Sequence, residues 1–166
     1  MIANQLAEAF NDHAIFRLEE NLVKIQKCVA LIDEEQTWQR PNNASNSIGN
    51  QLLHLCGNMT QYIISGLGGA PDIRQRAEEF SAKEGAQKEA LVGQLSEVVN
   101  KSVAVIKAMT AEELIRVRTV QGYAFSGAAV LLHAVEHFSY HAGQIAFWTK
   151  FLKDRDLKFY DDEALN

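Results

Sequence analysis

Apolar residues recur at helical spacing in four long stretches of the chain. In the first stretch Leu18, Leu22 and Ile25 fall on one face of a helix, with polar residues between them. The two prolines, Pro41 and Pro71, both fall where this periodicity stops. The pattern therefore predicts four long helices, over residues 2–32, 47–67, 81–109 and 126–152.

Serine and threonine residues mark the predicted helix starts. Ser81 followed by Glu84 has the spacing of a capping box and predicts that the third helix opens there. Thr110 with Glu113 repeats the signature and predicts one short extra turn. Ser126 is expected to cap the last helix.

Only one segment alternates in the way an extended strand does. It runs over Arg116–Gln121, and Gly122 ends it. Four long helices without a credible set of paired strands predict an all-α fold, a four-helix bundle. A length of 166 residues is typical of a single domain, here expected to span residues 1–166.

Composition and charge narrow the function classes. The apolar fraction of 47% and the charged fraction of 22% are those of an ordinary globular protein. A net charge of −5 with scattered basic residues argues against a nucleic-acid partner, which requires a clustered positive surface. No signal segment and no membrane-spanning apolar run is present, so a cytoplasmic protein without membrane contact is expected. Cys28 and Cys56 are too few for a disulfide framework and are expected to be buried.

The last predicted helix carries three histidines spaced four residues apart: His133, His137 and His141. Each step of four advances only about 40° around a helix, so all three imidazoles share one face. Neutral imidazoles at i and i+4 are well placed to share a divalent metal ion. The alternative is that they are packed core histidines, each hydrogen-bonded to a neighbour. Spacing alone leaves both interpretations open.

A fourth histidine, His54, lies on a polar stripe of the second helix. The stripe also contains Gln51, Asn58, Gln61 and Ser65. It is either a solvated face or the wall of a water-filled cleft that faces His137 and His141. Other metal and catalytic signatures, including HExxH, Glu-x-x-His and a phosphate-binding glycine loop, are absent from the sequence.

Three segments of the chain resemble the DinB superfamily, in particular a branch of small bacterial proteins. They are HLCGNMTQYI at 54–63, IRQRAEEF at 73–80 and VEHFSYHAGQIAFWTKFL at 135–152. The correspondence extends from about Ala44 to Leu152, with landmarks in the same order and at the same spacing.

This resemblance implies an up-down-down-up four-helix bundle, frequently a homodimer, that holds a divalent metal ion with three histidines. Carried over to this chain, the metal ligands are His54, His137 and His141, and the favoured ions are zinc and nickel. Gln144 matches a glutamine that orients a ligand or reaches the metal-bound water. His133 falls one turn outside the ligand pair and is expected either to support a ligand or to pack beside the site.

The resemblance favours a metal-dependent enzyme that acts on a small molecule, either a thiol-dependent S-transferase using a low-molecular-weight thiol or a hydrolase. No catalytic residue is assigned. Many relatives carry arginine directly after the second histidine of the pair, where this chain has Ala142, and this difference weakens the transfer of a substrate class. The alternative is a non-enzymatic dimeric bundle with a structural or vestigial metal site, since the sequence shows few acid–base groups near the histidines.

Overall fold

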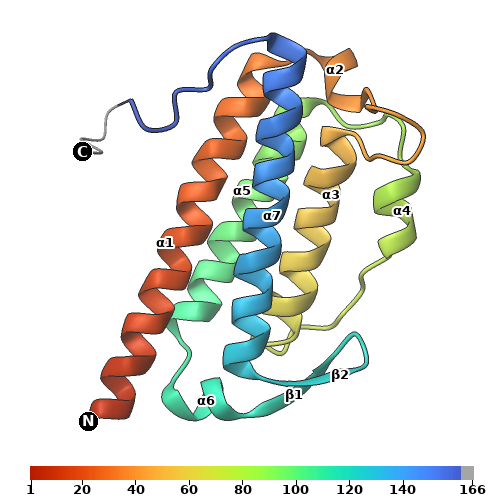
Figure 1. The fold of residues 1–166 in the computed structure, drawn as a ribbon. Helices are drawn as coiled ribbons and strands as arrows, with labels where there is room; N and C mark the ends of the chain where they lie inside the picture. The colour runs from red at the N-terminus through yellow and green to blue at the C-terminus, as the bar shows by residue number, and fades with distance from the viewer. Residues whose placement is uncertain (162–166) are drawn as a thin grey trace.

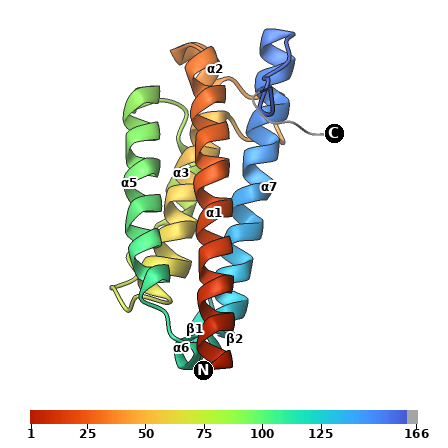
Figure 2. The ribbon, with the colours of Figure 1, turned by 90° about the vertical axis from the view of Figure 1, so that its left-hand side faces the viewer.

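The computed structural model describes residues 1–161, most of which are helical. Four long helical segments lie side by side along the molecule (Figures 1 and 2). These are α1 (Ile2–Leu31), α3 (Ile48–Met59) with its continuation η1 (Thr60–Ser65), α5 (Lys88–Lys107) and α7 (Gly127–Lys153). Short elements join them: α2 (Glu34–Trp38), α4 (Arg76–Ser81), α6 (Ala111–Ile115), β1 (Val117–Val120) and β2 (Tyr123–Ser126).

The core lies between the long helices. Leu18 of α1, Leu55 of α3, Leu95 of α5 and Phe138 of α7 are all fully buried. Each such side chain contributes about 1.5–3 kcal/mol by leaving water, so burial of these faces holds the helices together. Cys28 and Cys56 are buried free thiols, as predicted. Within residues 1–161 no helix is both long and apolar enough to cross a membrane.

The predicted caps are partly correct. The Ser126 hydroxyl accepts a hydrogen bond from the Ala129 amide, and Thr110 caps α6 in the same way through Glu113. The prediction that Ser81 opens the third helix is wrong, because Ser81 ends α4 and α5 begins at Lys88. Gly85, with a φ of +127°, lies between them in a conformation that no helix contains.

A β-hairpin precedes the last helix. β1 and β2 pair antiparallel, with Val120 opposite Tyr123. Gln121 and Gly122 between them both have positive φ, +52° and +82°, as a type I′ turn requires. The extended segment was predicted, but its partner strand was not, so the expectation of a fold without paired strands is wrong. The fold is mostly helical with a small two-stranded sheet.

The second long helix changes its geometry after Met59. The α-helix α3 becomes the π-helix η1, which adds a residue per turn and shifts the faces that its side chains occupy. Gly69, with a φ of +78°, follows the end of this segment, close to the predicted end at Leu67. The segment after Lys153 is not helical up to residue 161, close to the predicted end of the last helix at residue 152. Residues 162–166 lie outside the described residues.

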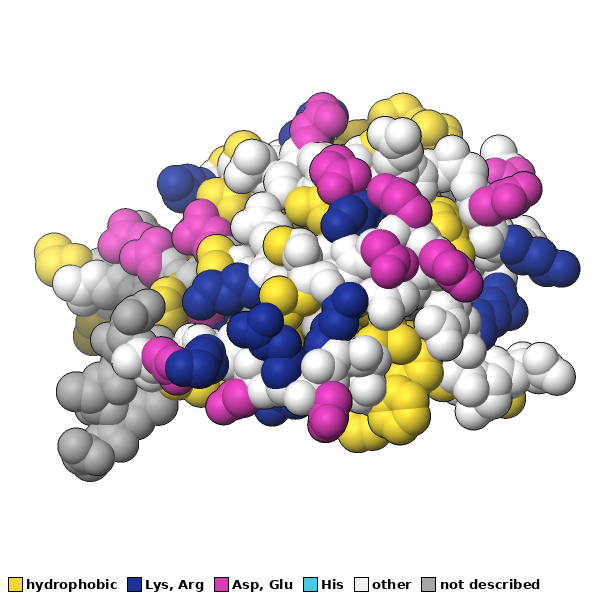
Figure 3. All heavy atoms as spheres, turned by 90° about the horizontal axis from the view of Figure 1, so that it is seen from above, with side chains coloured by type: hydrophobic (Ala, Val, Ile, Leu, Met, Phe, Trp, Pro, Cys, Tyr) yellow, Lys and Arg dark blue, Asp and Glu magenta, His cyan; other side chains and the backbone are white. Residues whose placement is uncertain are grey.

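Acidic, basic and apolar side chains are interspersed on the end of the molecule that is seen from above (Figure 3). On this face neither sign of charge forms a continuous field.

Candidate metal centre

Three histidines from two helices meet in the bundle. His54 lies on α3, and His137 and His141 lie one turn apart on α7. One ring nitrogen of each lies within 4.8 Å of those of the other two, and the ring centroids are 4.6–5.0 Å apart. Three imidazoles in this arrangement are a ligand group that can bind a divalent metal ion.

The polar stripe of α3 is buried. Gln51, His54 and Asn58 are each only 4–5% exposed. Of the two interpretations of this stripe, the solvated face is therefore wrong, and the side chains face the interior toward α7. Because buried polar groups cost free energy unless they are paired, their hydrogen bonds show what the site is arranged to hold.

A carboxylate holds one ring nitrogen of His54. Glu79, from α4, accepts a hydrogen bond from His54 Nδ1 at 2.8 Å. A proton on Nδ1 leaves the lone pair of Nε2 free, and Nε2 faces Nε2 of His137 at 3.1 Å. A carboxylate behind the imidazole is the usual companion of a metal-binding histidine, because it fixes the tautomer and raises the basicity of the ligand.

Arg74 fixes the carboxylate in turn. Its Nε and Nη2 donate to the two oxygens of Glu79 at 2.7 and 2.8 Å, and its side chain is 3% exposed. Burial alone raises the pKa of Glu79, but hydrogen bonds from Arg74 and His54 outweigh it and lower that pKa. Glu79 is therefore an anion at neutral pH, although it is buried.

Neutral amides surround His141. The Gln51 Oε1 atom lies 3.3 Å from His141 Nδ1, so it accepts the Nδ1 proton and leaves Nε2 free. Burial, and then His54, lowers the pKa of His141 to about 4, and a hydrogen bond with Gln144 opposes that shift. Gln144 thus lies beside the expected ligand, where it is able to orient it.

Of the three imidazoles, His137 is the one with a ring nitrogen that lacks a hydrogen-bond partner. Its Nδ1 atom is buried and has no hydrogen-bond partner among residues 1–161. Burial and the neighbouring His141, His54 and His133 lower its pKa to about 3. His137 and His141 are therefore neutral at pH 7, the state in which imidazole donates to a metal ion.

His133 does not join the cluster. Its ring packs on Tyr62 at a centroid distance of 4.4 Å and lies 5.7 Å from the ring of His137. The exposed His13, on α1, is also remote from the site and stacks on Phe16.

A chain of side-chain hydrogen bonds joins the hairpin to this centre. Gln61 Oε1 accepts from Arg74 Nη1 at 2.9 Å and from Gln121 Nε2 at 2.6 Å. Tyr62 donates its hydroxyl proton to Gln121 Oε1 at 3.0 Å. Gln61 and Tyr62 belong to the π-helix, so its changed geometry places them between the hairpin turn and Arg74.

Sequence reasoning missed Arg74 and Glu79 as members of the site. Both lie in the segment IRQRAEEF at 73–80, in the long connection between the second and third predicted helices. The one available signal was that this segment carried part of the resemblance. Glu79 also removes the apparent shortage of acid–base groups near the histidines.

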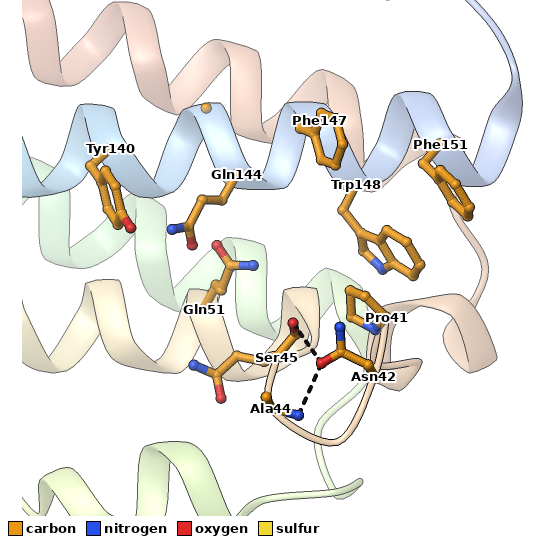
Figure 4. A pocket seen from close by; sticks show the side chains of 12 residues that line it. Pro41, Asn42, Ala44, Ser45, Gln51, Tyr140, Gln144, Phe147, Trp148 and Phe151 are labelled. Atoms are coloured by element: carbon orange, nitrogen blue, oxygen red, sulfur yellow. Dashed lines mark hydrogen bonds between the residues drawn. The ribbon is translucent and has the colours of Figure 1, made fainter.

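Two cavities flank the cluster. One, of about 350 Å³, is lined by His54 and His137 and by residues of η1, α4 and the hairpin. The other, of about 820 Å³, lies between α7 and the segment after Pro41 (Figure 4). In that view Gln51 and Gln144 approach each other at one end, and Trp148 and Phe151 project toward Pro41 at the other.

Comparison with known proteins identifies a family for this chain. A family model described as a protein of unknown function, DUF1572, matches residues 5–161. Comparison with curated proteins gives no match.

Solved structures with a similar fold include two DinB-like proteins. A DinB-like protein from Bacillus cereus superposes with a TM-score of 0.68 at 15% identity, covering 87% of this chain and 91% of its own. One from Bacillus subtilis gives 0.68 at 19% identity, covering 89% and 97%. A conserved Enterococcus faecalis protein gives 0.64 at 17%, covering 92% and 98%. The DinB-like fold that the resemblance implies is thereby confirmed, and at these identities the structures show similarity of fold alone.

Proposed function

The chain belongs to the DUF1572 family, with a DinB-like fold, and on that premise we propose that it is a metal-dependent enzyme. Its divalent ion is held by His54, His137 and His141. The observation that carries the proposal is the convergence of three buried ring nitrogens, two of them on imidazoles with strongly lowered pKa values, beside a cavity. Three protein ligands leave a coordination position for a substrate, which is typical of catalytic rather than structural sites.

The favoured reaction is thiol-dependent S-transfer to a small molecule, with hydrolysis as the other form of the same proposal. When bound, the ion supplies Lewis-acid chemistry, which lowers the pKa of a thiol or water brought to it. The chain's own residues hold the ligands in place: Glu79 fixes the His54 ring, Gln51 fixes His141, and Arg74 keeps Glu79 ionised.

Several further properties belong to the same proposal. Zinc and nickel are the favoured ions, because both accept imidazole nitrogen. We place the enzyme in the cytoplasm as a homodimer without nucleic-acid or membrane partners, with residues 1–166 as one up-down-down-up four-helix domain.

Metal analysis is the experiment that tests the site. Elemental mass spectrometry of the purified chain should find about one divalent ion per chain, as three histidine ligands require. The double variant His54→Ala, His137→Ala should contain almost none. His13→Ala is the matched control, because it removes an exposed histidine outside the cluster. Absence of metal in the native chain, even after incubation with zinc and nickel, contradicts the proposal.

Activity is tested separately on the metal-loaded chain. Panels of low-molecular-weight thiols with electrophiles, and of esters, should reveal turnover that His137→Ala abolishes. A chain that binds metal but turns over neither panel supports the alternative, a non-enzymatic module. One observation favours that alternative: the 3.1 Å contact between the Nε2 atoms of His54 and His137 gives these two rings a hydrogen bond without an ion.

A further inference from the structure

The 350 Å³ cavity beside His54 and His137 has an unusual charge for this protein. Two arginines, Arg74 and Arg76, line it, and no carboxylate side chain within residues 1–161 does. The chain as a whole carries a net charge of −5. The volume falls at the small end of the range of about 300–1,000 Å³ that is usual for small-molecule sites.

Only one of the two arginines has its charge compensated. Arg74 binds both oxygens of Glu79 and the amide of Gln61. Arg76 has no ion-pair partner in the part of the chain that the structure describes. Its guanidinium carbon lies 4.8 Å from the centroid of the Phe80 ring, and that ring lies 4.7 Å from the ring of His54. A cation–π contact therefore holds a free positive charge one aromatic ring away from the metal centre.

The cavity also contains an unused hydrogen-bonding group. Asn58 lines it, is 4% exposed, and its Oδ1 has no partner among the described residues. A buried amide oxygen without a partner costs free energy, so a polar group that occupies the cavity removes that cost. The amide is able to accept from a hydroxyl, thiol or amine of a ligand, or to donate after rotation.

Most of the remaining lining is aromatic, and Gln121 is the polar exception. Tyr123 and Phe125, two residues apart on β2, stack with a centroid distance of 5.7 Å and an interplanar angle of 17°. Tyr62 also lines the cavity, and its hydroxyl group donates a hydrogen bond that joins η1 to Gln121 of the hairpin turn. These rings provide flat apolar surface in the same cavity as Arg76 and Asn58.

We propose that this cavity binds the substrate of the metal centre, a small organic carboxylate with a flat apolar body. Arg76 pairs with the carboxylate, the aromatic side chains contact the body, and Asn58 binds a second polar group near His137. A planar guanidinium matches a carboxylate through two parallel hydrogen bonds, and one uncompensated positive charge balances a monoanion. This assignment rests on the proposed function, because it names the substrate class of that site.

Benzoate is the probe, measured by isothermal titration calorimetry on the full chain without metal at neutral pH, so that the carboxylate has no ion to bind. The native chain should bind benzoate, and Arg76→Gln should weaken binding about tenfold, the effect of losing one charge-assisted pair. Arg76→Glu should abolish it. Arg155→Gln, at an exposed arginine in the tail, is the matched control and should leave the affinity unchanged. Benzyl alcohol, with the same ring and no charge, should not distinguish these variants.

Three outcomes overturn the assignment: no benzoate binding to the native chain, equal affinity in Arg76→Gln, or displacement of benzoate by inorganic phosphate at lower concentration. Metal content of the same preparations, measured before the metal is removed and again after incubation with zinc and nickel, separates this assignment from the proposed function. If benzoate binding depends on Arg76 but the chain takes up no metal, the metal centre is excluded and the anion site is supported. If the metal content is normal and benzoate binds Arg76→Gln as tightly as the native chain, the anion site is excluded and the metal centre is not.

Discussion

At the scale of single residues, the three imidazoles of the candidate site differ in the hydrogen-bond partner of their Nδ1 atom. His54 has the anion Glu79, His141 has the neutral amide of Gln51, and the Nδ1 of His137 has no partner among residues 1–161. The three proposed ligands therefore differ in what fixes them. His54 is the one whose Nδ1 is hydrogen-bonded to a carboxylate, which fixes its tautomer and ring orientation.

The first prediction concerns Glu79. Glu79→Gln should weaken metal affinity about 10- to 100-fold, because the amide no longer fixes the tautomer of His54 as an anion does. Competition against a chromophoric chelator measures this. Glu78→Gln is the matched control, since Glu78 is the exposed neighbour on the same short helix, and it should bind as the native chain does. Equal losses in both variants would assign the effect to helix α4 rather than to the carboxylate.

The second prediction concerns pH. The pKa values of His137 and His141 are about 3 and 4 in the folded chain, against 6.5 for the unperturbed group. Between those values the unfolded chain binds more protons, so the stability of the metal-free protein is full above about pH 6.5 and falls as pH decreases. Urea midpoints at about pH 7 and pH 5 should show the decline. The double variant His137→Gln, His141→Gln should show a smaller one; an equal decline would exclude these two residues as its source.

At the scale of elements, α4 and the connection before it are fixed by a close approach to α3. Gly57 lies where a β-carbon would meet Glu79 Oε1 at 2.0 Å and Arg74 Nε at 2.9 Å. Asn50, near the start of α3, donates to the carbonyls of Glu79 and Ala82 at 2.9 and 2.7 Å. Helix α3 therefore carries one proposed metal ligand and also positions the segment that supports that residue.

The third prediction follows from this contact. Gly57→Ala should displace the Glu79–Arg74 pair, weaken metal binding as Glu79→Gln does, and cost about 1–3 kcal/mol of stability through overpacking. Gly93→Ala, on α5, is the control: its β-carbon would meet nothing within 4 Å, so it should stabilise the chain by about 0.5–1 kcal/mol. Chelator competition and urea unfolding measure the two effects. Unchanged metal affinity in Gly57→Ala would show that the pair does not support the site.

The same elements show how far sequence reasoning reaches. Periodicity predicted all four long helices, because burial of one face gives them a repeating pattern, and i, i+4 spacing placed His137 and His141 together. It did not find Glu79, since this residue reaches His54 from 25 positions away through a connection without periodicity. Nor did it find β2, a four-residue strand that is mostly exposed and lacks an apolar alternation. Ser81 and Glu84 have the spacing of a capping box, but no helix begins there. The positive φ of Gly85 and the hydrogen bond from Asn50 to the Ala82 carbonyl hold this segment in a non-helical conformation.

At the scale of the whole molecule, the proposed ligands join helices that are far apart in the chain. In the sequence, α4, α5, α6 and the hairpin lie between α3 and α7, yet the two helices meet at the histidines, where His54 Nε2 lies 3.1 Å from His137 Nε2. A bound ion would therefore add bonds between α3 and α7 that the unfolded chain does not have.

The fourth prediction is that metal raises thermal stability. An ion that binds only the native state stabilises it by about 2.7 kcal/mol at a concentration one hundred times its Kd. Melting curves with zinc or nickel should shift upward in the native chain and in His13→Ala, and chelator should reverse the shift. His54→Ala should not respond. A melting temperature independent of metal in the native chain would contradict a native-state metal site.

The placement of the ligands has a consequence for when the site comes into existence. His54 and His137 are 83 positions apart, and two of the three imidazoles lie on α7, the last helix of the described chain. Until α7 has been synthesised, only His54 of the three proposed ligands is present. A three-histidine site therefore cannot form before that point, and an ion held by the proposed site would be captured only once α7 has packed against α3.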